Sequence, residues 1–183
     1  MYNLFLDTTG KDFCIALFDL NFNLIKSVIL ENYKKKIDLI VKYFNDFNIK
    51  INEINGLYIN LGPGFFTGVR VGFVFFRTLA LANNIDFYTT TTFELLMMQN
   101  DKDTFYTDAQ GKKVYFFDKQ MFLKTEDIFE STKVIDATDN ITLDNINYQK
   151  VISKFLAYQH IFTKKHPLEV EPTYIKKPQI GSK

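Results

Sequence analysis

The chain has 183 residues, a formal net charge of +1 and 46% hydrophobic residues, including 20 Phe and 10 Tyr. This length suits one domain or two small ones, and the apolar content is ample for a core. So small a net charge gives no global field that would attract nucleic acid or a membrane surface. The single cysteine, Cys14, excludes an internal disulfide. No apolar run reaches the roughly 18 residues of a membrane span, and the N-terminus lacks a secretory signal pattern, so we expect a cytoplasmic protein with no membrane contact.

The beginning of the chain predicts three consecutive strands. Residues 2–8 are apolar and end in the turn Asp7-Thr8-Thr9-Gly10, and residues 13–19 and 24–30 have the composition of two further strands. Connections this short predict antiparallel neighbours.

A helix, a strand, a second helix and another strand are predicted next. The first helix has an apolar side that recurs at spacings of three and four, formed by Ile37, Ile40, Phe44 and Phe47. A buried strand follows over 56–61, and the apolar run 66–82 is too long for a strand and predicts a helix. After a short strand at 85–88, Thr91 or Thr92 caps a further helix. The predicted order is therefore βββαβαβα.

Residues 62–72, Gly-Pro-Gly-Phe-Phe-Thr-Gly-Val-Arg-Val-Gly, are the most informative stretch of the chain. The motif turn comprises Gly62, Pro63, Gly64, Thr67, Gly68 and Arg70. The chain's two arginines, Arg70 and Arg77, fall in the helix that begins here and lie two turns apart on one face. Pro63 removes one N–H donor and no Gly-Lys-Ser/Thr follows, so a rigid turn that directs the helix is favoured over an anion site.

The second half is predicted to repeat the opening pattern in a shorter form. A polar linker at 100–103 precedes strands at 105–108 and 114–118, and residues 120–124 could be a third strand. Residues 146–158 have a helical pattern, and 160–166 read as a loop. The sequence thus predicts an α/β fold with an N-terminal subdomain at 1–100 and a shortened C-terminal subdomain at 104–183.

Several of these segments resemble the TsaB (YeaZ-like) family of the tRNA threonylcarbamoyladenosine pathway. The segments that carry the resemblance are Asp7-Thr8-Thr9, residues 62–72, Thr92-Phe93-Glu94-Leu95-Leu96, residues 108–115 and residues 172–177. The family's hallmark is Gly-Pro-Gly-Ser-Phe-Thr-Gly-Leu-Arg-Ile-Gly, and Phe65 stands where its serine would be. Lys35-Lys36 replaces the family's His-Ser pair. The resemblance implies an actin-like (ribonuclease H-like) half followed by a shortened second copy.

The resemblance also implies a non-catalytic subunit. Members of the family pair with TsaD, which holds nucleotide and metal and transfers threonylcarbamoyl to the tRNA adenosine next to the anticodon. They work with the ATPase TsaE, and they also form homodimers. We accordingly expect no cofactor in this chain and only indirect contact with tRNA.

The family's contact is a bundle of the two N-terminal helices of each protein. Carried onto this chain, it predicts partner contacts at Ile37, Ile40, Val41, Phe44, Val69, Phe73, Phe76 and Arg77. The helix at 66–82 is apolar on nearly every side, which fits a partner surface but also fits burial under the second subdomain. On this hypothesis Phe73→Asp abolishes pairing and leaves the fold intact.

Two other functions are alternatives to a non-catalytic subunit. A small actin-like kinase would use Asp7 and Thr9 at phosphate, although the turn after them lacks a glycine pair. A tRNA-binding module would use Lys34 to Lys36 and the C-terminal tail. The two histidines, His160 and His166, are six residues apart, a spacing that does not place two ligands on one helical face, so we expect no metal site.

Overall fold

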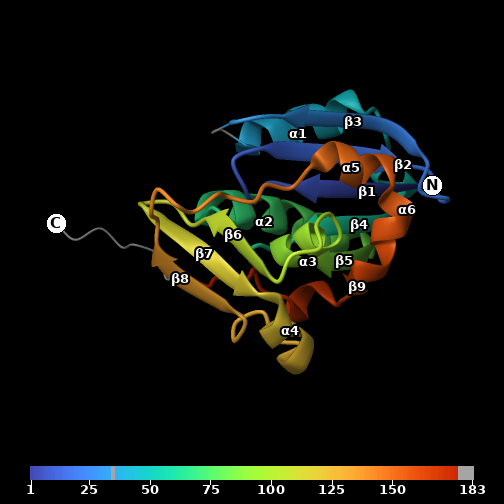
Figure 1. Cartoon of the computed structure of the whole chain (residues 1–183). Helices are drawn as coiled ribbons and strands as arrows, with labels where there is room; N and C mark the ends of the chain where they lie inside the picture. The colour runs from blue at the N-terminus through green and yellow to red at the C-terminus, as the bar shows by residue number, and fades with distance from the viewer. Residues whose placement is uncertain (34–35, 177–183) are drawn as a thin grey trace.

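The protein, for which a computed structural model describes residues 1–33 and 36–176, is an α/β fold with two sheets (Figure 1). The larger sheet has six strands in the order β3-β2-β1-β4-β5-β9. These strands are β1 (Tyr2–Asp7), β2 (Phe13–Phe18), β3 (Leu24–Leu30), β4 (Ile54–Asn60), β5 (Asp86–Thr90) and β9 (Thr163–Lys164). The first three are antiparallel neighbours, as predicted, whereas β1, β4 and β5 are parallel.

Helices cover both faces of the larger sheet (Figure 1). One face packs against α1 (Lys36–Asp46) and α2 (Phe66–Asn83), and the other against α5 (Tyr148–Ser153) and α6 (Phe155–Tyr158). With α3 (Thr92–Met97), the first half has the predicted order βββαβαβα. The 3-10 turns are η1 (Ile51–Glu53), η2 (Gln159–Ile161) and η3 (Pro167–Glu169). The Thr91 hydroxyl accepts a hydrogen bond from the Glu94 amide and so caps α3.

The smaller sheet is an antiparallel meander of β6 (Thr104–Asp108), β7 (Lys113–Asp118) and β8 (Thr132–Asp136). The opening βββ pattern therefore does recur, but the predicted third strand at 120–124 is wrong. That segment lies in helix α4 (Lys119–Thr125), because the Asp118 carboxylate accepts a hydrogen bond from the Met121 amide at 3.0 Å and caps a helical turn.

The C-terminal part of the chain returns to the larger sheet. Phe155 of α6 stacks on Phe18 of β2, with ring centroids 4.4 Å apart. Residues 160–166 were predicted to be a loop, but they contain strand β9, so this prediction is wrong in part. Strand β9 pairs with β5. The second half of the chain is thus shared between the sheets: β6, β7 and β8 form the smaller one, whereas α5, α6 and β9 join the larger one.

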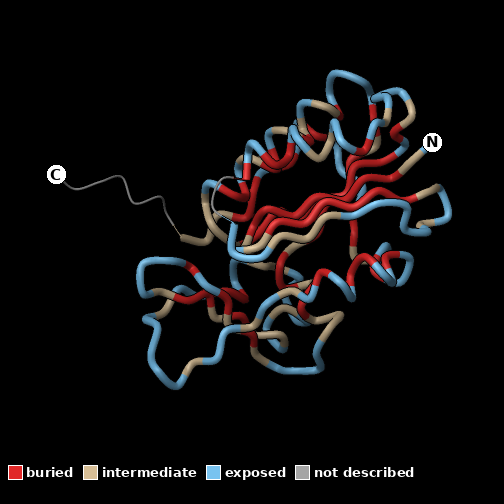
Figure 2. The backbone as a smooth tube through the Cα atoms, turned by 90° about the horizontal axis from the view of Figure 1, so that it is seen from above, coloured by how far each residue is buried: buried red, intermediate tan, exposed pale blue. Residues whose placement is uncertain are grey.

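Figure 2 shows the core as a continuous buried layer along the strands and the inner sides of the helices. Helix α1 contributes Leu39 and Ile40 to this layer, and Phe47, directly after the helix, is buried with them. Ile37, which was predicted to lie on the same apolar side, is 59% exposed. The buried side of α1 is therefore rotated away from Ile37, since Lys36 occupies the inward position at the start of the helix.

Candidate partner-binding site

The motif turn holds the start of α2 against the end of β1. The Phe65 amide donates to the Thr9 carbonyl at 2.6 Å, and the Thr8 hydroxyl donates to the Gly68 carbonyl at 2.7 Å. A methyl group at Gly68 would overlap the Thr8 carbonyl oxygen, so only glycine permits this approach. These contacts fix the direction in which α2 leaves the motif turn.

Asp7, the acidic residue of the hypothetical kinase, is fully buried at the end of β1. Its carboxylate accepts hydrogen bonds from the Thr9 amide and from Asn60 Nδ2, each at 2.8 Å. Burial raises the pKa of Asp7, although these hydrogen bonds oppose the shift. The interactions link the β1–β2 turn to the end of β4, so Asp7 organises the fold at this point.

Lys36 closes the same turn from the side of α1. Its Nζ donates to the carbonyls of Thr8 at 2.9 Å and Asp12 at 2.7 Å, and also to the carbonyl of Gly10. Burial lowers the pKa of Lys36 to about 8, although the negative charges of Asp7 and Asp12 oppose this shift. This role of Lys36 was not predicted, because its only signal in the sequence is a lysine pair in place of the family's His-Ser.

Replacing Lys36 by Met is expected to destabilise the fold by about 1–3 kcal/mol at pH 7, because the buried Thr8 carbonyl loses its ammonium donor. The folded wild type releases the Lys36 proton near pH 8, whereas the unfolded chain holds it to about pH 10.5. Between these values the unfolded state binds more protons, so the Lys36 contribution to stability increases with pH. Urea unfolding of the wild type and of Lys36→Met across pH 7.5–10 measures how the difference between their free energies of unfolding changes with pH. Lys42→Met, on the exposed side of α1, is the control and is expected to follow the wild type.

A small cavity lies between the two sheets, beside the β1–β2 turn. Its lining includes Thr9, Asp12, Gly64, Thr92, Asp108 and Tyr148, and its volume is about 130 Å³. Ligand pockets usually measure about 300–1,000 Å³. The cavity that the described residues form beside Thr9 is therefore smaller than a usual ligand pocket, which disfavours the kinase hypothesis.

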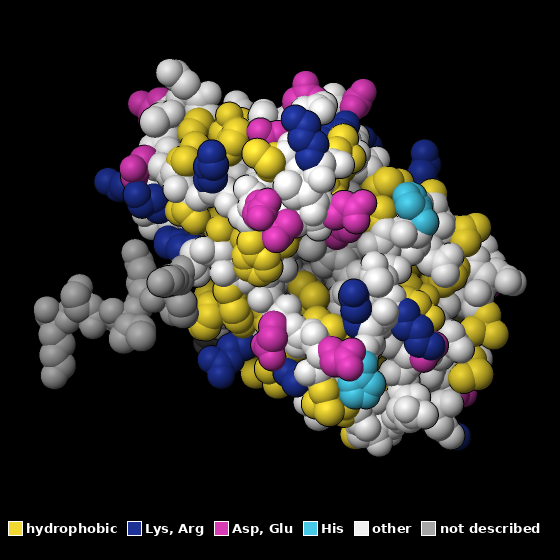
Figure 3. Space-filling view, turned by 90° about the horizontal axis from the view of Figure 1, so that it is seen from below, with side chains coloured by type: hydrophobic (Ala, Val, Ile, Leu, Met, Phe, Trp, Pro, Cys, Tyr) yellow, Lys and Arg dark blue, Asp and Glu magenta, His cyan; other side chains and the backbone are white. Residues whose placement is uncertain are grey.

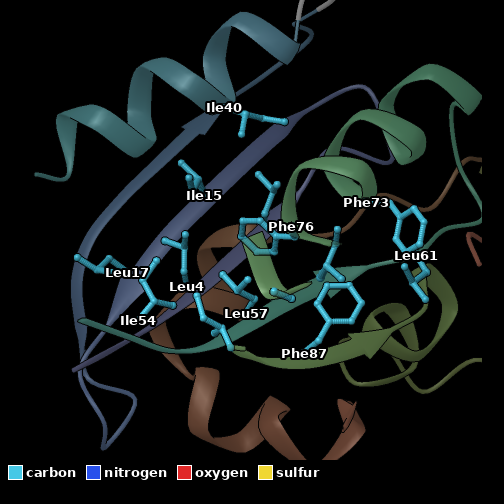
Figure 4. Close-up of a cluster of buried hydrophobic side chains, with 14 of the residues drawn as sticks. Leu4, Ile15, Leu17, Ile40, Ile54, Leu57, Leu61, Phe73, Phe76 and Phe87 are labelled. Carbon is cyan, nitrogen blue, oxygen red and sulfur yellow. The ribbon is translucent and has the colours of Figure 1, made fainter. Parts of the chain in front are cut away.

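Half of the predicted partner contacts lie in the core. Ile40, Val69, Phe73 and Phe76 are each at most 3% exposed. Figure 4 shows Ile40 on α1, and Phe73 and Phe76 on α2, among the side chains of the sheet. The assignment of these four residues to the partner surface is wrong, because this side of the helices covers the chain's own sheet. It follows that Phe73→Asp is expected to unfold the protein.

The outward side of the two helices carries a different set of apolar residues. Ile37 and Val41 on α1 are 59% and 50% exposed, and Val74 and Leu81 on α2 are 51% and 42% exposed. Phe44 and Phe75, both half-buried, join the helices through an edge-on ring contact with centroids 5.7 Å apart. We call these six residues and the half-buried Val71 the α1–α2 face. It retains Ile37, Val41 and Phe44 from the predicted contacts.

The two arginines of α2 have different environments. The Arg77 guanidinium lies 5.3 Å from the centre of the Phe73 ring, and its Nη1 lies 3.7 Å from Glu171 Oε1. Arg77 therefore connects α2 to the segment that follows η3. Arg70 and Thr67 are exposed near the start of α2, at one end of the α1–α2 face.

Metal ligands are not clustered in the part of the chain that the structure describes, where no group of three or more His, Cys, Asp and Glu could hold an ion. Figure 3 shows the two histidines well apart on one face of the molecule. No helix within residues 1–33 and 36–176 is long and apolar enough to cross a membrane.

The first half has the element order βββαβαβα, and its strands lie in the order β3-β2-β1-β4-β5. A shorter βββ meander follows it, and together the two parts define an actin-like fold. The model of the TsaD family, described as tRNA N6-adenosine threonylcarbamoyltransferase, matches residues 29–174, and the chain belongs to this family. The family takes part in tRNA threonylcarbamoylation. No curated protein matches the sequence.

Two solved structures have a similar fold. One is an uncharacterized protein with similarity to peptidase YEAZ from Pseudomonas aeruginosa, with a TM-score of 0.63 and 14% identity, covering 96% of this chain and 99% of that one. The other is YeaZ from Pseudomonas aeruginosa, with a TM-score of 0.53 and 15% identity, covering 79% of this chain and 71% of that one. The family match and these folds confirm the resemblance to TsaB (YeaZ-like) proteins seen in the sequence motifs.

Proposed function

We propose that the chain is a non-catalytic subunit that binds a TsaD-type protein and supports threonylcarbamoyl transfer to the tRNA adenosine next to the anticodon. The observation that carries this proposal is the α1–α2 face, where four large apolar residues on two adjacent helices are each more than 40% exposed. Large exposed apolar residues gathered on two adjacent helices are typical of a protein interaction site.

The arrangement of the helices supports a helix-to-helix contact. Helices α1 and α2 pack side by side on the sheet, and the Phe44–Phe75 contact joins them on the outward side. A pair of helices with an apolar outer side can be covered by two helices of a partner, giving a four-helix arrangement. A second copy of the chain could cover the same residues, so the homodimer and the complex with TsaD compete for one surface.

The interior of the chain supports a non-catalytic role. The Asp7 carboxylate and the Lys36 ammonium are both buried and engaged in hydrogen bonds within the fold. On this proposal, nucleotide and metal belong to the TsaD-type partner. A TsaE-type ATPase acts on the assembled pair.

The experiment that tests the proposal is to mix the chain with its cognate TsaD-type protein and measure molar mass by size exclusion with light scattering, with and without ATP. A complex with one copy of each protein that replaces the homodimer supports the proposal. If the two proteins elute separately under both conditions and the chain alone hydrolyses ATP, the subunit hypothesis is wrong and the kinase hypothesis replaces it.

A further inference from the structure

A groove of about 710 Å³ opens where the β1–β2 turn, the starts of α1 and α2 and the β6–β7 turn meet. In Figure 1 these segments lie at the left end of the molecule. The described residues that line the groove are Lys11, Asn32, Tyr33, Lys36, Ile37, Asp38, Phe65, Thr67, Gly68, Val71 and Gln110. We call it the turn groove. Its volume falls in the range that accepts a nucleotide-sized group.

Two lysines line the turn groove. Lys11 is exposed on its wall, and the ammonium group of Lys36 lies beneath it. Lys176 lies outside the lining but near the β6–β7 turn, where its Nζ donates to the carbonyl of Ala109 at 3.0 Å and to that of the lining residue Gln110 at 2.9 Å. Asp38 is the one carboxylate among the described residues that line the groove. Such a site favours an anionic ligand.

Aromatic surface accompanies this charge. Tyr33 is 43% exposed at the groove, and the ring of Phe65 is half-buried beside it. Exposed aromatic rings next to cationic side chains are the combination that binds single-stranded nucleic acid, because bases stack on the rings while phosphates approach the cations.

We propose that the turn groove binds an unpaired segment of RNA, with a phosphate at Lys11 and a base stacked on Tyr33. The groove is of the size of one nucleotide, so it fits a loop with unstacked bases better than a duplex. Ile37 and Val71 belong both to the groove and to the α1–α2 face, so RNA held here would lie at the edge of that face.

This inference goes beyond the proposed function, which needs no direct contact between this chain and RNA. It also differs from the sequence-based hypothesis, because the Lys36 ammonium is committed to backbone carbonyls and Lys34 and Lys35 lie outside the described residues.

The test is the affinity of a fluorescently labelled tRNA anticodon stem-loop, measured by polarisation at several salt concentrations, for the chain alone and for its complex with the TsaD-type protein. Lys11→Glu is expected to weaken binding about tenfold and to reduce the salt slope by about one, as expected for one lost phosphate contact. Tyr33→Ala is expected to weaken binding about tenfold, whereas Tyr33→Phe retains the stacking surface and binds like the wild type.

Lys154→Glu is the matched control, because Lys154 is exposed between α5 and α6 on the other side of the sheet. The proposal is overturned if neither the chain nor the complex binds the RNA, or if Lys11→Glu and Lys154→Glu have equal effects. It is also overturned if the groove variants lose the protein partner but retain RNA affinity, since the groove would then be part of the protein interface. Co-purification with the partner is measured separately, so failure of the proposed function is distinguished from failure of this inference.

Discussion

Val74→Asp is expected to abolish pairing with the TsaD-type protein while leaving the isolated chain folded. Val74 lies on the outward side of α2 and is 51% exposed, so an aspartate there remains hydrated in the free chain. We expect its free energy of unfolding to change by no more than about 0.5 kcal/mol. In the complex the same carboxylate would be buried without a partner, which costs several kcal/mol and weakens binding at least about 100-fold.

Two other substitutions make this experiment decisive. Leu156→Asp places the same charge on an equally apolar, 62% exposed position of α6, on the other side of the sheet, and should leave pairing unchanged. Phe73→Asp changes the neighbouring residue, which is 3% exposed, and should unfold the chain. Circular dichroism and titration calorimetry on the four proteins separate loss of fold from loss of binding. Normal pairing by Val74→Asp would show that the partner binds elsewhere.

Gly68→Ala is expected to destabilise the fold by about 3 kcal/mol, a cost at the upper end of overpacking effects. The added methyl group would overlap the backbone carbonyl oxygen of Thr8, and neither that carbonyl nor the start of α2 can move without losing the hydrogen bond between Thr8 and Gly68. In a chain of this length such a loss lowers Tm by about 6–12 °C.

Gly10→Ala is the control for this substitution. The β-carbon of an alanine at position 10 would meet no described atom within 4 Å, although Gly10 belongs to the same β1–β2 turn. We expect wild-type stability or a slight gain, because alanine restricts the unfolded chain. Thermal unfolding followed by circular dichroism compares the two variants. Equal stability of Gly68→Ala and the wild type would mean that α2 does not approach β1 as closely as the structure shows.

Much of the first half of the fold was predictable because its signals are local. The helix predicted at 66–82 is observed as Phe66–Asn83, since its length excludes a strand and glycine and proline separate it from β4. The third strand of the smaller sheet was misplaced because Asp118 caps a helix in a segment whose composition does not distinguish helix from strand. Strand β9 was missed because a two-residue strand has no periodicity.

The candidate site was predictable only in part. The outward residues Ile37 and Val41 were among the predicted contacts, but Val74 and Leu81 were not. Lys36 gave no sign of its role, because its three acceptors are backbone carbonyls, which every residue carries.

The sequence by itself determined the α/β class, the repeated βββ opening, the glycine turn before α2 and the family, because short motifs and hydrophobic periods encode these features directly. Only the tertiary structure decided which side of α2 faces outward. The helix is apolar around nearly its whole circumference, so periodicity cannot separate the residues that cover the sheet from those left exposed. Packing against β1, β4 and β5 buries Val69, Phe73 and Phe76, and what remains exposed is the side that we propose a partner covers.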